Sequence, residues 1–369
     1  MHDIRDDLML NKMLRRMPLC VAPISSIICG LVVLTILISG CSPAVQTHQG
    51  YLQKPKLTEH FFISSDDNKL PLTVWKPKTG KTQAVVIALH GFNDHSGAFK
   101  ELGSNLADHG YLFYAYDQRG FGNTQKRGIW AGTDLLVQDL KEMVSLIEKA
   151  HPNLPIHALG ESMGGAVILS AMSRKNKANR PRLTSIVLSA PAVWGRTTMP
   201  AWQSKILDSL VHVIPMIKLT PQGLDINPSD NLDMLKALRN DPRYITESRL
   251  DAIYGLTNLM DRALEASGYQ DTPMLILYGA KDDLVPKSST CKMLTKLPNG
   301  KQKRWRLAFY PNGYHLLFRD LEGALVVKDI IAWFNSKKTE LPSGYEIDLS
   351  EVKNFAHSDC LASSKLIYK

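Results

Sequence analysis

Residues 160–164, with the sequence Gly-Glu-Ser-Met-Gly, separate two apolar runs of different kinds. The run before them, 154–159, predicts a buried strand, and the run after them, 165–172, predicts a helix. A strand that turns directly into a helix has to turn tightly, which requires small residues on both sides of Ser162. The segment therefore predicts a strand–turn–helix unit that presents the Ser162 hydroxyl above the edge of a sheet, the geometry of a nucleophile elbow.

Apolar runs and helix-like segments alternate from residue 60 onward. The runs are apolar throughout, which is typical of strands covered on both faces, as in a parallel sheet. They are residues 72–75, 84–89, 111–116, 154–159, 185–189, 274–278 and 305–310. The helix-like segments are residues 97–108, 133–149, 164–172, 288–297 and 321–337. The alternation predicts an α/β fold with a mostly parallel, doubly wound sheet.

Residues 194–269 interrupt this alternation with helix patterns and no strand pattern. We therefore expect a helical cap inserted into one α/β core. The core then consists of residues 59–193 and 270–340, and a C-terminal extension covers residues 341–369.

An apolar stripe recurs at helical spacing within the predicted cap, over residues 202–214. Insertions at this point of an α/β sheet overhang the strand ends where ligands bind. Trp202, Ile206 and Leu210 are therefore candidates for contact with an apolar part of a substrate. The alternative is that the stripe only packs against the core.

The N-terminal region has the organisation of an export signal. Arg15 and Arg16 precede an apolar run over residues 27–38, and small residues lead from this run to Cys41. The run has about a dozen residues, whereas a helix that spans a bilayer needs about 20. A cysteine in this position resembles the lipobox of bacterial lipoproteins, in which that cysteine carries the lipid. A plain signal peptide and an uncleaved membrane anchor are the alternatives.

We accordingly expect residues 1–41 to be a lipoprotein signal ending at Cys41, and the polar residues 42–58 to be a tether. Ser42 resembles the residues that permit sorting to the outer membrane. The expected location is the bacterial cell envelope, with the protein lipid-anchored and facing the periplasm.

Charge and cysteine content add weaker constraints. The formal net charge of +9 favours attraction to an anionic membrane. We expect no nucleic-acid partner, because the sequence has no block of arginine and lysine interleaved with aromatic residues. Cys291 and Cys360 remain after the signal, and they either form a disulfide or stay as two thiols.

Two further residues complete a candidate catalytic triad. A serine hydroxyl needs a base to take its proton and a third group to orient that base. Asp282 follows the run 274–278, and His315 follows the run 305–310, so both are expected at the strand ends beside Ser162. The order Ser, Asp, His is that of α/β-hydrolases. Asp283 is the alternative acid, and either aspartate could instead cap the following helix. This chemistry requires no metal and no organic cofactor.

The sequence His90-Gly91-Phe92 follows the run 84–89 and predicts an oxyanion hole. The backbone N–H groups of Phe92 and Met163 are the expected donors to a developing oxyanion. His90 is expected to brace this loop. The glycines at 120 and 122 fit a tight structural loop after the run 111–116.

Several motifs together resemble one branch of the α/β-hydrolases, the monoacylglycerol lipase and lysophospholipase-like (serine aminopeptidase-type) branch. They are His90-Gly91-x3-His95-Ser96, Asp117-x2-Gly120-x-Gly122, Gly160-Glu161-Ser162-Met163-Gly164-Gly165, Gly279-x2-Asp282-x2-Val285-Pro286 and Tyr314-His315. Two cap sequences, Pro221-Gln222-Gly223-Leu224-Asp225 and Arg239-Asn240-Asp241-Pro242, are similar to that branch as well. Asp94 stands where many members carry Glu, and Thr124 where many carry Ser.

The resemblance implies an α/β-hydrolase fold with Ser162, Asp282 and His315 as triad and Phe92 and Met163 as oxyanion donors. It also implies a serine esterase acting on monoacylglycerols or lysophospholipids. A peptidase or an acyltransferase on the same scaffold is the alternative among enzymes. A catalytically silent lipoprotein that binds lipid is the alternative outside them.

Overall fold

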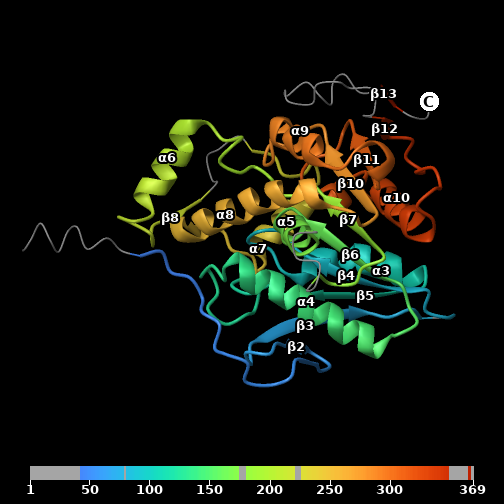
Figure 1. Cartoon of the computed structure of the whole chain (residues 1–369), viewed down its shortest axis with the longest axis horizontal. Coiled ribbons are helices and arrows are strands. Elements are labelled where there is room, and N and C mark those ends of the chain that lie inside the picture. Colours follow the sequence, from blue (N-terminus) through green and yellow to red (C-terminus); the bar gives the residue numbers. More distant parts are fainter. Residues whose placement is uncertain (1–41, 79, 174–179, 221–225, 349–364, 367–369) are drawn as a thin grey trace, which may run out of the picture. The chain divides into compact units, whose positions relative to one another are not determined.

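The computed structural model describes residues 42–78, 80–173, 180–220, 226–348 and 365–366 (Figure 1). The predicted signal peptide, with Cys41, lies outside these residues, as does Cys360. The described residues form a large sheet whose strands are β1 (Lys56–Leu57), β2 (Phe61–Ile63), β3 (Lys69–Trp75), β4 (Ala84–Leu89), β5 (Tyr111–Tyr116), β6 (Ile156–Glu161), β7 (Ser185–Ser189), β10 (Met274–Gly279), β11 (Trp305–Tyr310), β12 (Glu346–Asp348) and β13 (Lys365–Leu366).

The strand order is β1-β2-β3-β5-β4-β6-β7-β10-β11-β12-β13. The pairs from β5 to β11 are parallel, and the strands outside them pair antiparallel. The seven predicted strands are therefore confirmed, and so is the mostly parallel sheet. The parallel strands bring their carboxyl ends to one edge, where the candidate catalytic residues follow β6, β10 and β11.

Helices cover both faces of this sheet. They are α3 (Lys100–Asp108), α4 (Thr133–Ala150), α5 (Met163–Ala171), α6 (Ala201–Leu210), α7 (Leu232–Asn240), α8 (Leu250–Ala266), α9 (Lys287–Lys296) and α10 (Gly323–Asn335), with short 3-10 turns η1 (Ser96–Phe99), η3 (Ser267–Tyr269), η4 (Gly300–Gln302) and η5 (Leu317–Arg319). The buried side chains of α4, α5, α8 and α9 join one core cluster, and those of α3 and α10 join a second.

Strand β4 shows why the runs are apolar throughout. Val85 and Ile87 belong to the first core cluster, while Val86 and Ala88 belong to the second. Successive side chains of a strand point to opposite faces, so a strand covered on both faces needs apolar residues at every position.

The region 194–269 differs in two ways from the predicted cap. It contains two short strands, β8 (Lys218–Leu219) and β9 (Ser248–Arg249), which pair antiparallel, so the expectation of no strand was wrong. Two-residue strands leave no periodic pattern to detect. In addition, α8 packs against α5 with one side buried, whereas α6 and α7 have no buried residue. Figure 1 shows α6 standing away from the sheet.

The segment 42–58 is held against the core and is not a free tether. The backbone N–H of Ala44 donates to Asp251 Oδ2 at 3.0 Å, and that of Gln46 donates to the Trp130 carbonyl at 2.9 Å. These contacts depend on main-chain groups, which a polar, aperiodic sequence does not reveal. At the other terminus, β12 of the predicted extension pairs with β11 and joins the sheet.

Cys291 is fully buried in α9 and takes part in a disulfide. Cys360 lies outside the described residues, so its pairing with Cys291 stays one of the two alternatives.

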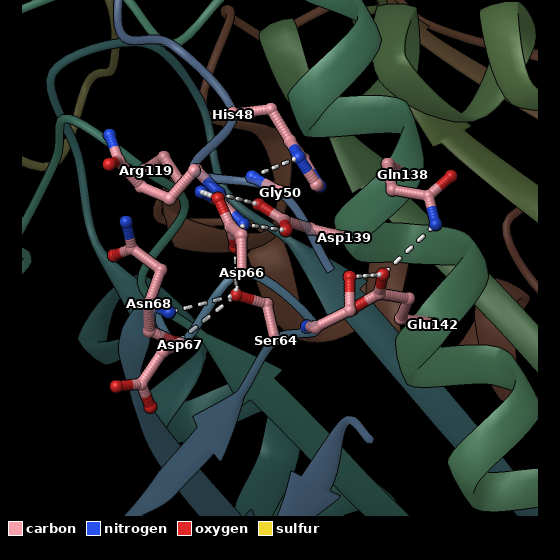
Figure 2. Close-up of polar contacts among 12 residues, drawn as sticks. His48, Gly50, Ser64, Asp66, Asp67, Asn68, Arg119, Gln138, Asp139 and Glu142 are labelled. Carbon is pink, nitrogen blue, oxygen red and sulfur yellow. Dashed lines mark hydrogen bonds and ion pairs between the residues drawn. The ribbon is translucent and has the colours of Figure 1, made fainter. Parts of the chain in front are cut away.

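The buried Arg119, on the loop after β5, joins distant parts of the core (Figure 2). Its guanidinium donates to both carboxylate oxygens of Asp66 at 2.6 and 2.7 Å, and to both of Asp139 at 2.7 Å. Burial would raise the pKa of Asp66, but the hydrogen bonds from Arg119 lower it to about 2. The cluster fastens the β2–β3 turn to α4, in line with a structural role for this loop.

Candidate active site

Ser162 occupies the sharp turn between β6 and α5, with a positive φ of 52°. Its N–H donates to the Ser189 carbonyl at 2.9 Å, and its carbonyl accepts from Ala192 N at 2.9 Å. A Cβ at Gly164 would lie 2.0 Å from the carbonyl oxygen of Leu89, so only glycine allows α5 to start this close to β4. The turn therefore has the strained, glycine-flanked form of a nucleophile elbow.

Asp282 and His315 meet at the same edge of the sheet. The Nδ1 atom of His315 lies 2.9 Å from Oδ2 of Asp282, and both side chains are buried. The other carboxylate oxygen of Asp282 accepts from the N–H groups of Leu284 and Val285, at 2.8 and 2.9 Å. Asp283 is exposed, and its carboxylate accepts a hydrogen bond from the backbone N–H of residue 227 at 3.4 Å. Of the two candidate acids, Asp282 is the one that contacts the histidine.

A close approach of two loops makes this contact possible. A Cβ at Gly279 would lie 2.4 Å from the carbonyl oxygens of Gly313 and Tyr314. The N–H of Lys281 also donates to the Gly313 carbonyl at 2.9 Å. The loop that carries Asp282 and the loop that carries His315 thus run in contact.

The surrounding charges favour the protonated form of His315. Burial lowers the pKa of its imidazole, but the carboxylates of Asp282 and Glu161 more than offset this, so the pKa is raised. Arg319 acts in the opposite direction. A histidine that gains a proton easily and is held at Nδ1 by a carboxylate is suited to act as a general base.

The two expected oxyanion donors lie next to Ser162. Met163 is the first residue of α5, so its N–H has no acceptor within the helix. Gly91 approaches the serine closely, since a Cβ at this position would lie 3.5 Å from Ser162 Cβ. This places the loop that carries Phe92 beside the nucleophile.

His90 braces that loop. Its Nε2 accepts from Gln118 N at 2.9 Å, so Nδ1 carries the proton and donates to the Gly91 carbonyl at 2.8 Å. Burial lowers the pKa of His90, which keeps the ring neutral. The Phe92 ring packs edge-on against Phe121, with 5.3 Å between ring centroids. A cavity beside it holds about 10 Å³, room for about one water molecule.

Three residues of the apolar stripe are exposed on α6, whereas Val211, directly after the helix, is fully buried. Trp202 is 63% exposed, Ile206 49% and Leu210 39%. The alternative that the stripe packs against the core is therefore wrong for these three residues and correct for Val211. More apolar side chains are exposed after the helix, namely Val213, Ile214, Met216, Ile217 and Leu219.

The site also contains a buried arginine that no sequence motif indicated. Arg319, in η5, donates to Glu161 Oε2 at 2.7 Å, and its Nη2 atom lies 2.8 Å from Asp94 Oδ2. The signal in the sequence was a charged residue directly after the apolar residues 316–318. A buried charge has to be paired, so such a residue indicates a partner elsewhere in the chain.

A sequence profile of the family described as "Serine aminopeptidase, S33" matches residues 80–322 of the chain. Human monoglyceride lipase is 30% identical over 264 residues, which cover 70% of this chain and 84% of the human protein. The chain belongs to the serine aminopeptidase S33 family. Monoacylglycerol lipase of Mycolicibacterium smegmatis is 28% identical over 288 residues, or 76% of this chain and 97% of that protein. The match to the S33 family profile and the similarity to these relatives show that the chain is a serine ester hydrolase.

Solved structures of proteins named monoacylglycerol or monoglyceride lipase agree on the fold. A monoacylglycerol lipase from Paleococcus ferrophilus matches with a TM-score of 0.59 and 23% identity, and covers 72% of this chain and 97% of its own. A soluble variant of monoglyceride lipase from Saccharomyces cerevisiae matches with a TM-score of 0.63 and 20% identity, and covers 81% and 100%. At these identities the likeness establishes the α/β-hydrolase fold.

Proposed function

We propose that the protein is a membrane-tethered serine hydrolase that cleaves monoacylglycerols or lysophospholipids through an acyl-enzyme. The observation that carries the proposal is the pairing of His315 with Asp282 at the sheet edge where Ser162 occupies the elbow. Relatives named monoacylglycerol lipase and phospholipase support the substrate class.

Each of these groups has one role in the proposed reaction. Ser162 Oγ attacks the ester carbonyl carbon while His315 Nε2 takes its proton, and Asp282 stabilises the resulting imidazolium. The oxyanion accepts hydrogen bonds from the N–H groups of Phe92 and Met163. When the intermediate collapses, the carbon–oxygen bond to the alcohol breaks and the imidazolium donates its proton to that alcohol. Water then attacks the acyl-enzyme by the same route and releases the fatty acid.

The exposed apolar side chains of α6 supply contacts for the acyl chain or for the lipid surface that delivers it. Trp202, Ile206 and Leu210 have large solvent-exposed fractions, and exposed apolar clusters of this kind mark contact sites for lipids or partners.

Lipidation at Cys41 would hold this surface close to a bilayer. Ala44 is fastened to Asp251 at the start of α8, so only three residue steps, about 10 Å of extended chain, lie between the lipid and the enzyme. β9, directly before α8, pairs with β8 in the apolar segment that follows α6. Within the described residues, no helix is both long and apolar enough to cross a membrane.

A fluorophosphonate probe tests the chemistry directly. The wild-type protein should be labelled, and Ser162→Ala should lose both the label and essentially all ester hydrolysis while its melting temperature is retained. A series of monoacylglycerols and lysophospholipids then defines the substrate. Labelling at another residue would contradict the triad, and preferential cleavage of aminoacyl amides would favour the peptidase alternative.

Metabolic labelling with palmitate tests the tether. The wild-type protein should incorporate the lipid and partition into detergent, because several acyl chains hold a protein at a membrane far more firmly than one. Cys41→Ala should stay unlabelled. Recovery of the wild-type protein without lipid would contradict the tether and leave the catalytic proposal intact.

A further inference from the structure

Arg319 in η5 connects the end of β6 and the loop after β4 to its own segment. Its Nη2 atom donates to Glu161 Oε2 at 2.7 Å and lies 2.8 Å from Asp94 Oδ2. All three side chains are buried, with 9% exposure for Arg319, 3% for Asp94 and none for Glu161. The contacts are therefore shielded from water. A charged hydrogen bond is stronger in such a buried environment than in water.

Asp94 and Arg319 lie on the segments that follow β4 and β11, and Glu161 is the last residue of β6. Each is a close neighbour of a proposed catalytic group. Glu161 directly precedes Ser162, and Asp94 lies two residues after Phe92. Arg319 itself lies four residues after His315. One guanidinium thus joins the three chain segments that carry the nucleophile, an oxyanion donor and the base.

We propose that Arg319 is a positioning residue that holds these three segments in register, and that Asp94 and Glu161 are its anchors. The proposal rests on the triad and oxyanion roles proposed above and adds a group that sequence motifs did not indicate. Asp94 also receives the N–H of His95 at its Oδ1 atom, 2.9 Å away, which orients its carboxylate toward the guanidinium.

Two unpaired polar atoms separate this cluster from an ordinary structural ion pair. The Oε1 atom of Glu161 and the Nε atom of Arg319 are buried and have no hydrogen-bond partner within the described residues. Unpaired buried polar atoms lower stability, so the cluster is not optimised for stability alone. Arg119, by contrast, uses its whole guanidinium to pair two carboxylates, and its partners lie on the β2–β3 turn and α4. It serves as a matched control.

The test compares lysine and methionine variants of the two arginines. Active sites are titrated with a fluorophosphonate, and kcat per titrated site and KM are measured with a short, soluble p-nitrophenyl ester. We expect Arg319→Met to lower kcat about 100-fold, because a misplacement of about 1 Å at a catalytic group has an effect of this size. KM should change far less. Arg319→Lys should recover part of kcat, since it keeps the charge but not the planar fork.

Arg119→Lys and Arg119→Met should lower the melting temperature but leave kcat per titrated site unchanged. If the Arg319 variants behave in the same way, with normal kcat per site, the positioning role is wrong. If Arg319→Met does not fold, Arg319→Lys and Asp94→Asn decide the question by the same measurement. Loss of labelling in Ser162→Ala is independent of these results, so failure of the triad and failure of the positioning role can be distinguished.

Discussion

The carboxylate of Asp282 receives three hydrogen bonds, one from His315 Nδ1 at 2.9 Å and two from backbone N–H groups of its own loop. The two backbone hydrogen bonds hold the carboxylate in the orientation in which it contacts the imidazole. Asp283, its neighbour in sequence, is exposed and points to a different partner. The two adjacent aspartates therefore differ in burial and in partner: Asp282 is buried and contacts His315, whereas Asp283 is exposed and does not.

Asp282→Asn should lower kcat by about 10⁴-fold, because the amide favours the wrong tautomer of the histidine. Asp283→Asn is the matched control and should change kcat only slightly. Labelling by the fluorophosphonate should follow the same order. It should be slower in Asp282→Asn than in wild type and nearly unchanged in Asp283→Asn. Steady-state kinetics on one soluble ester decide the matter, and a larger penalty at Asp283 would contradict the assignment of the acid.

Glu161→Gln should move the acid limb of the pH profile of kcat/KM to lower pH. The charge of Glu161 raises the pKa of His315, and glutamine keeps an acceptor for Arg319 without the charge. The pKa of His315 should therefore fall, and the neutral base should persist to lower pH.

The measurement for Glu161→Gln is the pH dependence of kcat/KM for wild type and variant on one ester. Burial raises the pKa of Glu161 itself to about 7, so the wild-type profile should also contain its titration. A limb that shifts to higher pH would mean that the charge of Glu161 does not act on His315.

Leu210→Asp should leave the free energy of unfolding within about 0.5 kcal/mol of wild type, because the side chain is 39% exposed on a helix without buried residues. If Leu210 contacts the acyl chain, loss of about two buried methylenes costs about 1.6 kcal/mol, or about 15-fold in kcat/KM for long chains. Short esters should be hydrolysed normally.

Leu232→Asp is the control for Leu210→Asp, since Leu232 is also an exposed leucine, 74% accessible, but lies at the start of α7. Thermal unfolding and a chain-length series give both readouts. Equal chain-length profiles for the two variants and the wild type would rule out a role of Leu210 in acyl binding.

The sequence by itself determined the seven predicted strands of the sheet and the residues that follow them at its carboxyl edge. Continuous apolar runs such as 84–89 arise because both faces of the strand are buried, which is a property of consecutive residues. The glycines around Ser162 likewise report a turn that is local in the chain. Patterns of this kind need no knowledge of distant neighbours.

Only the tertiary structure decided which distant residues are paired. Arg319 and Glu161 are 158 residues apart, and no periodicity relates them. The contact of Ala44 with Asp251 uses a backbone N–H that is the same in every sequence. The exposure of Leu210 depends on whether another element covers α6, while an amphipathic stripe looks the same in either case. Pairing and exposure are set by packing between segments, because a side chain's burial and partners come from whatever the fold brings beside it.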